Sequence, residues 1–186
     1  MSCHGSMFGR RKMTSRESRS PTLFILVVVA LATVAFIIVN SLQSSEGSWS
    51  ESNVVAALFE PVLRCIYAVV GKAMSWMGLP ALSYGVFVRK LAHFCEYFLL
   101  GAECATLTAV LVGRAISPYV WTDLFIVLAV GVIDEFVQFT SGRTSLITDV
   151  MLDFSGAALG IAVALAVAAI VFRRRRRGKH SRAARR

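Results

Sequence analysis

The stretch that decides the fold is residues 91–112, LAHFCEYFLLGAECATLTAVLV. A helix needs about 20 predominantly apolar residues to cross the hydrocarbon core of a bilayer, which is about 30 Å thick. Residues 22–39, 120–139 and 150–172 have a similar length and a similar apolar character. The sequence therefore predicts an all-α fold, a polytopic membrane helix bundle with about four transmembrane helices.

The composition also favours a membrane protein and leaves little room for a separate soluble module. Hydrophobic residues make up 56% of the 186 residues, and charged residues make up 17%. Soluble domains are about half apolar and about one quarter charged. We therefore expect a single membrane domain over residues 22–172.

The positive charge of the chain is concentrated at its two ends. The formal net charge is +9, and fifteen of the twenty Lys and Arg residues lie in residues 1–21, at Arg114 or in residues 173–186. Basic segments beside membrane helices favour the cytoplasmic side, and anionic lipid headgroups attract them. We interpret residues 1–21 as a disordered basic cytoplasmic tail and residues 173–186 as a second basic cytoplasmic tail, and we expect no nucleic acid partner.

The region between the first two apolar stretches is more polar. Residues 40–53 are rich in Ser and are predicted to form a loop. Residues 54–77 have apolar side chains at helical spacing, interrupted by Pro61, Arg64 and Lys72. This pattern fits an interfacial amphipathic helix or a short fifth span. Two cytoplasmic termini require an even number of crossings, so we favour four crossings with residues 54–77 lying on the outer surface.

This topology places most of the polar residues of the apolar segments near the outer surface. The last turns of the span 120–139, the loop that follows it and the first turns of the spans 91–112 and 150–172 all lie at that level. A charge at the centre of a membrane helix costs roughly 2.5–3.5 kcal/mol on insertion scales, so a buried polar site is the expected arrangement. The residues concerned are His93, Glu96, Asp134, Glu135, Gln138, Arg143, Asp149 and Asp153.

Helical spacing directs these side chains toward one another. His93 and Glu96 are three residues apart and share a helix face, as do Asp134 and Gln138, which are four apart. Glu103 continues the face of His93 about 15 Å further along the helix, near the middle of the bilayer. It is therefore a candidate group for a conduit through the membrane.

A second pattern predicts close packing of the last span. Gly156 and Gly160 are four residues apart and continue the helix face of Asp153. Small residues at this spacing allow two membrane helices to approach closely. We expect these two glycines to pack against a neighbouring helix.

Two interpretations of the polar set remain open. It can be structural, because internal ion pairs and hydrogen bonds hold membrane helices together, and Asp149 alone would fit a helix N-cap. The set as a whole favours a site or a pathway, because five carboxylates exceed the local positive charge. The local basic residues are Arg89, Lys90, His93 and Arg143.

The chemistry of the polar set is less well defined. His93 and Glu96 could supply two metal ligands, but the sequence has no HExxH motif and no second histidine nearby, so we expect no metal and no cofactor. Ser141, Thr144 and Ser145 lie near the site without a nucleophile motif around them. A histidine beside carboxylates can act as a general acid or base, and enzymatic activity stays an open question.

Three blocks of sequence resemble the VanZ-like family of bacterial membrane proteins. They are residues 90–101, KLAHFCEYFLLG, residues 134–143, DEFVQFTSGR, and residues 149–156, DVMLDFSG, followed by Gly160. The similarity covers roughly residues 22–165. It departs from the family at Asp153, where a small polar residue such as Asn is expected. The resemblance implies a multi-pass protein of the bacterial cytoplasmic membrane with a role at the cell envelope, and the founding member is associated with low-level teicoplanin resistance.

The residues and the resemblance together give three functional hypotheses. The first is an outward-facing polar pocket that binds or modifies an envelope component, such as a lipid-linked or glycopeptide ligand. In it, Arg143 would bind a phosphate or carboxylate and His93 with Glu96 would handle protons. The second is a proton- or ion-coupled carrier that uses Glu103, or a non-catalytic membrane scaffold. The third is a purely structural polar cluster.

Overall fold

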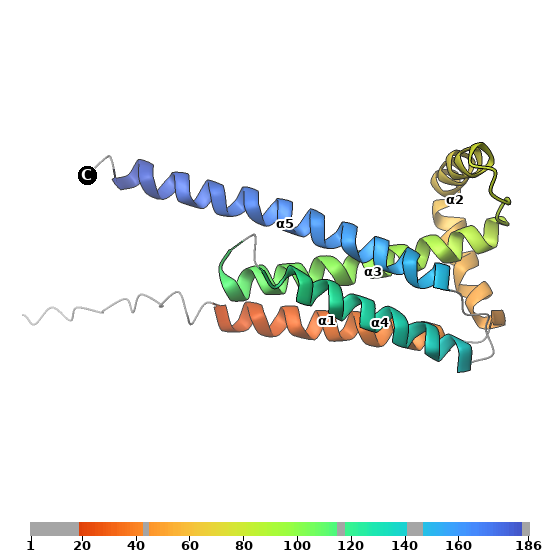
Figure 1. The fold of residues 1–186 in the computed structure, drawn as a ribbon, viewed down its shortest axis with the longest axis horizontal. Helices are drawn as coiled ribbons and strands as arrows, with labels where there is room; N and C mark the ends of the chain where they lie inside the picture. Colours follow the sequence, from red (N-terminus) through yellow and green to blue (C-terminus); the bar gives the residue numbers. More distant parts are fainter. Residues whose placement is uncertain (1–18, 43–44, 115–117, 141–146, 184–186) are drawn as a thin grey trace, which may run out of the picture.

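The computed structural model describes residues 19–42, 45–114, 118–140 and 147–183, and it contains five helices in this part of the chain (Figure 1). No strand occurs in these residues, so the predicted all-α fold is confirmed. The helices are α1 (Arg19–Leu42), α2 (Ser45–Trp76), α3 (Tyr84–Val112), α4 (Val120–Thr140) and α5 (Ile147–Ala183).

Helix α3 forms the centre of the bundle. Its largest interface is with α5, and it also packs against α1, α4 and α2. Figure 1 shows α1, α3, α4 and α5 running along the long axis of the molecule, whereas α2 lies at one end of it. The core consists of apolar side chains from α1, α3, α4 and α5: Ile37, Tyr97, Leu100, Ala105, Val127, Ala157 and Ile161.

The outer surface of this bundle is apolar, as expected for contact with lipid. Phe24 of α1 is 71% exposed and Phe125 of α4 is also 71% exposed. Large exposed apolar patches are uncommon on soluble monomers. Within the described residues, three helical segments are long and apolar enough to cross a membrane: Pro21–Leu42, Tyr84–Val112 and Ile147–Arg174.

Helix α4 is the most acidic of the four helices predicted to span the membrane. It has the length and apolar character of a span, but its three acidic residues, Asp123, Asp134 and Glu135, set it apart from the three segments above. All three carboxylate side chains are buried inside the bundle, whereas Trp121 and Phe136 face outward. Its acidic residues therefore belong to the interior of the bundle rather than to the lipid-facing surface.

Several helix boundaries differ from those predicted. The expected loop at residues 40–53 is wrong for most of its length, because α1 continues to Leu42 and α2 begins at Ser45. Helix α3 begins at Tyr84, seven residues before the predicted span, after Ser83 caps it by accepting a hydrogen bond from the Val86 N–H. Helix α5 begins at Ile147, so Asp149 lies in its first turn and is not the N-cap.

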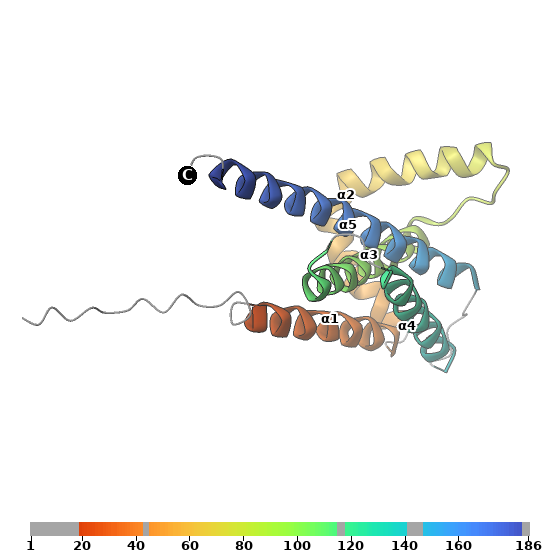
Figure 2. The ribbon, with the colours of Figure 1, turned by 60° about the vertical axis from the view of Figure 1, so that its left-hand side comes forward.

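Helix α2 changes direction along its length. It contains Pro61, which removes a backbone hydrogen bond and bends a helix, and its two halves point in different directions (Figures 1 and 2). Its second half is attached to the start of α3 through Tyr67, whose hydroxyl donates to the Leu82 carbonyl at 2.6 Å. The Tyr67 ring also lies 5.4 Å from that of Tyr84 and 5.3 Å from that of Phe87.

Glycines bring the backbones of α3 and α5 into close contact. A Cβ atom at Gly156 would lie 2.5 Å from the Phe94 carbonyl oxygen, and one at Gly160 would lie 2.0 Å from that of Phe98. A Cβ atom at Gly101 of α3 would meet the α5 backbone in the same way, at 2.2 Å. No larger residue fits at these three positions without separating the helices.

Candidate functional site

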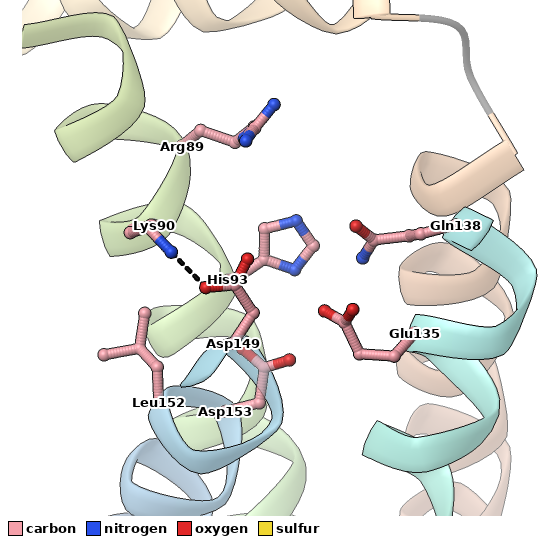
Figure 3. Close-up of a pocket in the computed structure, with 8 residues that line it drawn as sticks. All are labelled: Arg89, Lys90, His93, Glu135, Gln138, Asp149, Leu152 and Asp153. Atoms are coloured by element: carbon pink, nitrogen blue, oxygen red, sulfur yellow. Dashed lines mark hydrogen bonds and ion pairs between the residues drawn. The ribbon is translucent and has the colours of Figure 1, made fainter. Parts of the chain in front are cut away.

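A polar pocket lies between the beginning of α3, the end of α4 and the beginning of α5. It encloses about 270 Å³ of space, including the part that is open to the surroundings. Figure 3 shows Glu135 and Gln138 pointing from α4 toward His93 of α3, with Asp153 of α5 below His93 in this view. The lining residues are Arg89, Lys90, His93, Glu135, Gln138, Asp149, Leu152 and Asp153.

Three potential metal-ligating groups meet at the inner wall of this pocket. His93, Asp134 and Asp153 each offer one donor atom, and these atoms all lie within 4.8 Å of one another. Asp134 is fully buried and Asp153 is 2% exposed. The Nδ1 atom of His93 lies 4.0 Å from Oδ2 of Asp134 and 4.0 Å from Oε2 of Glu96.

Asp134 is held by hydrogen bonds from two helices. The Ser41 hydroxyl of α1 donates to its Oδ1 atom. The side-chain amide of Gln138, one turn further along α4, donates to Oδ2 at 3.0 Å and to the Ser41 hydroxyl oxygen at 3.3 Å. A buried carboxylate without such donors would be strongly destabilising, so this network fixes the end of α1 against α4.

Helix α1 contributes a second contact to the site. The Asn40 side-chain amide donates to Oε1 of Glu96 at 3.1 Å. Asn40 and Ser41 both lie in the last turn of α1, in the stretch that the sequence predicted as loop. The polar site therefore draws on four helices, whereas sequence reasoning assigned it to three.

The entrance of the pocket carries the basic side chains. Lys90 of α3 forms an ion pair with Asp149 of α5, and both side chains are partly buried. Arg89 lines the same pocket, and within the described part of the chain it has no ion-pair partner. The pocket thus has a free guanidinium near its entrance and carboxylates along its inner wall.

Two further acidic residues lie outside the pocket. Glu103 of α3 accepts a hydrogen bond from the Thr33 hydroxyl of α1 at 3.0 Å. Asp123, in the first turn of α4, accepts one from the Thr108 hydroxyl of α3 at 2.8 Å and is 3% exposed. Glu103 is ten residues beyond His93, or about 15 Å along α3, so it is not part of the polar pocket.

The structure brings most of the predicted site residues together. His93, Glu135, Gln138 and Asp149 line the pocket, and Glu96 and Asp134 adjoin it. Gly156 and Gly160 lie at the α3–α5 contact. Arg143 lies outside the described residues, together with Ser141, Thr144 and Ser145.

Sequence reasoning missed two residues of the interior, Tyr97 and Asp123. It did include Asp153 in the polar set, although this residue departs from the family pattern, and its spacing of four from Asp149 places it on the same helix face. Tyr97 follows Glu96 directly and is fully buried, but an aromatic residue in an apolar helix gives no specific signal. Asp123 lies eleven residues before Asp134, at the opposite end of the same helix.

The geometry allows two kinds of binding and one kind of proton chemistry. Carboxylates at the inner wall suit cations, and the Arg89 guanidinium suits a phosphate or carboxylate group. His93 lies among carboxylates that could exchange protons with it. Much of the space in the pocket is open to the surroundings, and the enclosed part has room for little more than an ion or a water molecule, so a larger group would bind partly outside it.

The apolar outer surface, the three membrane-length helices and the buried polar pocket define a helical membrane protein. A family model described as VanZ/LLP1 matches residues 24–171, which is most of the chain. The chain therefore belongs to the VanZ-like family, and the resemblance identified from the sequence is confirmed. Comparisons with curated proteins and with solved structures gave no significant match.

Proposed function

We propose that this VanZ-like protein binds the anionic headgroup of a cell-envelope component in the polar pocket between α3, α4 and α5. The observation that carries the proposal is the position of Arg89, whose guanidinium lines the pocket without a partner among the described residues. An arginine fork can bind a phosphate or carboxylate through two parallel hydrogen bonds. A lipid-linked phosphate or a glycopeptide carboxylate has this chemistry, and the family resemblance favours both.

The arrangement of the helix ends supports an outward-facing pocket. In Figure 1 the first residues of α1 and the last residues of α5 lie at the same end of the bundle, and the start of α3 and the end of α4 lie at the other. Arg173 and Arg174 belong to the end of α5, and basic flanks favour the cytoplasm. On this basis the protein is a multi-pass protein of the bacterial cytoplasmic membrane with both termini inside, where anionic lipid headgroups contact the basic tails.

The orientation can be tested with single cysteines in a cysteine-free background. Thr140→Cys should react with an impermeant maleimide added to intact cells, because Thr140 is exposed at the end of α4 beside the pocket. Arg174→Cys should react only after the membrane is permeabilised. Labelling of Arg174→Cys but not of Thr140→Cys in intact cells would show the opposite orientation, with the pocket on the cytoplasmic side.

The binding function can be tested through Arg89. In a strain whose envelope-drug susceptibility depends on this protein, Arg89→Gln should lower resistance to teicoplanin or abolish a comparable envelope phenotype. Arg64→Gln is a matched control, since Arg64 lies on α2, is exposed and forms an ion pair with Glu60. An unchanged phenotype for Arg89→Gln at normal membrane abundance would refute binding through this guanidinium.

A second candidate function is a small proton- or ion-coupled carrier. It is favoured by two acidic residues further along the bundle, the partly buried Glu103 with Thr33 and the buried Asp123 with Thr108. A conduit needs ionisable groups at several depths, whereas a headgroup site needs them only in the pocket. Glu103→Gln should abolish function in a carrier and have little effect in a headgroup-binding protein.

A further inference from the structure

The floor of the pocket, formed by His93, Asp134 and Asp153, has the composition of a metal site. Its three donor atoms come from three different helices and lie within 4.8 Å of one another. Metal–ligand bonds of about 2.0–2.2 Å place the ligand atoms of one ion about 3.0–4.2 Å apart. The 4.0 Å between Nδ1 of His93 and Oδ2 of Asp134 falls within this range.

The floor also brings buried carboxylates close together. Asp134 and Asp153 are at most 2% exposed, and Glu96 lies beside them. Among the described residues, Lys90 is paired with Asp149 rather than with Asp134 or Asp153. Burying carboxylates without an opposite charge is costly, and a bound cation would offset that cost directly.

Tyr97 gives an independent indication of a ligand at the floor. Its side chain is completely buried, yet its hydroxyl has no hydrogen-bond partner of normal geometry in the described part of the chain. The carboxylates of Asp134, Asp153 and Glu96 lie around this hydroxyl, and Asp134 is the one close enough to accept a loose hydrogen bond from it. Buried hydroxyls are nearly always well hydrogen-bonded, so a loosely bonded one beside buried carboxylates is consistent with a water or an ion at the floor.

We propose that His93, Asp134 and Asp153 bind one divalent transition-metal ion. One imidazole nitrogen with two carboxylate oxygens suits an ion such as Zn²⁺ or Mn²⁺ better than Mg²⁺ or Ca²⁺, which prefer oxygen alone. Sequence reasoning expected no metal because the chain has no HExxH motif and no second histidine near His93; the carboxylates that complete this set lie on α4 and α5. The ion would present positive charge to the pocket above it, but its binding does not require the proposed envelope ligand.

Metal binding by the purified full-length protein in detergent tests this proposal. After treatment with a chelator, the protein is titrated with Zn²⁺ and with Mn²⁺, and the bound metal is measured by mass spectrometry together with the melting temperature. We expect about one ion per chain and a rise in melting temperature. His93→Gln and Asp153→Asn should each weaken binding at least about tenfold, the smallest loss typical even for residues that only support metal ligands.

Asp123→Asn is the matched control, because Asp123 is an equally buried carboxylate of α4 whose bond from Thr108 an asparagine oxygen can keep. It should bind metal as the unsubstituted protein does. Cys3, His4 and His180 remain in every variant, so binding by the terminal segments appears equally in all of them. Equal metal content in the unsubstituted protein and in both floor variants, each eluting as a folded species, would overturn the proposal. An unchanged envelope phenotype for Arg89→Gln would refute headgroup binding through Arg89 but would not contradict the metal site.

Discussion

The hydroxyl of Ser41 at the end of α1 donates a hydrogen bond to Asp134 of α4, 93 residues later in the chain. Both side chains are completely buried. This contact joins the first span to the helix that carries Asp134 and Glu135. It makes α1 part of the support of the site and not merely a membrane anchor.

Removing this hydroxyl should destabilise the bundle. Ser41→Ala leaves Asp134 with only the Gln138 amide as a donor, and an unsatisfied buried group costs about 1–3 kcal/mol. Thermal unfolding in detergent should therefore occur at a lower temperature. Ser155→Ala is the control, because Ser155 is exposed and bonds only to the Leu152 carbonyl of its own helix. Equal melting temperatures for the two variants would contradict the role of Ser41.

The glycine contacts give a prediction about packing. Gly160→Ala should destabilise the protein by about 1–3 kcal/mol, because the added methyl group would overlap the α3 backbone. Gly71→Ala on α2 meets no atom within 4 Å and should be neutral or stabilising by up to about 1 kcal/mol, since alanine favours helix more than glycine does. The melting temperature of Gly160→Ala should therefore fall, whereas that of Gly71→Ala should stay the same or rise. Equal shifts would indicate that α3 and α5 are not in backbone contact.

The ion pair at the pocket entrance should be measurable as a coupling energy. Lys90→Met and Asp149→Asn each break the pair between α3 and α5, whose side chains are 26% and 21% exposed. In a double-mutant cycle on unfolding free energy we expect a coupling of about 1 kcal/mol, at the upper end for ion pairs that remain in contact with solvent. The value should fall as the salt concentration rises. A coupling near zero at low salt would show that the pair does not join the helices.

The attachment of α2 depends on Tyr67. Tyr67→Phe removes the hydrogen bond to the Leu82 carbonyl, so amide hydrogen exchange should become faster in residues 61–76. Tyr84→Phe is a close control, because the buried Tyr84 hydroxyl has no partner among the described residues and its removal should leave exchange unchanged. Unchanged exchange in both variants would mean that the aromatic contacts, which phenylalanine keeps, hold α2 without the hydrogen bond. Faster exchange in both variants would mean that the effect is not specific to the bond from Tyr67 to Leu82.

The fold class could be predicted because membrane-length apolar stretches leave few alternatives to helices. Helix boundaries were harder to predict, since Arg89 and Lys90 made the first turns of α3 resemble a loop although Ser83 is a recognisable cap. The polar, Ser-rich residues 45–53 are helical despite weak helix propensity. Local pattern therefore identified the spans but underestimated how far the helices extend beyond the apolar core.

The candidate site was predictable only where its residues lie on helix faces at regular spacing. His93, Asp134 and Gln138 were found in this way. Asn40 and Ser41 were not, because a polar residue just beyond an apolar run is typical of a loop, and only tertiary contact reveals its partner. The pairing of Lys90 with Asp149 likewise depends on how two helices are placed side by side.

The glycine contact between α3 and α5 also determines how the pocket can change shape. Two helices that touch backbone to backbone, with carbonyls filling the spaces above the glycines, resist both sliding and rotation. They act as one rigid unit that carries Arg89, His93 and Asp153. Helix α4 forms the third side of the pocket, and its interface with each neighbour is smaller than the one between α3 and α5. Any widening of the pocket would therefore require a shift of α4, including its bond from Ser41 to Asp134.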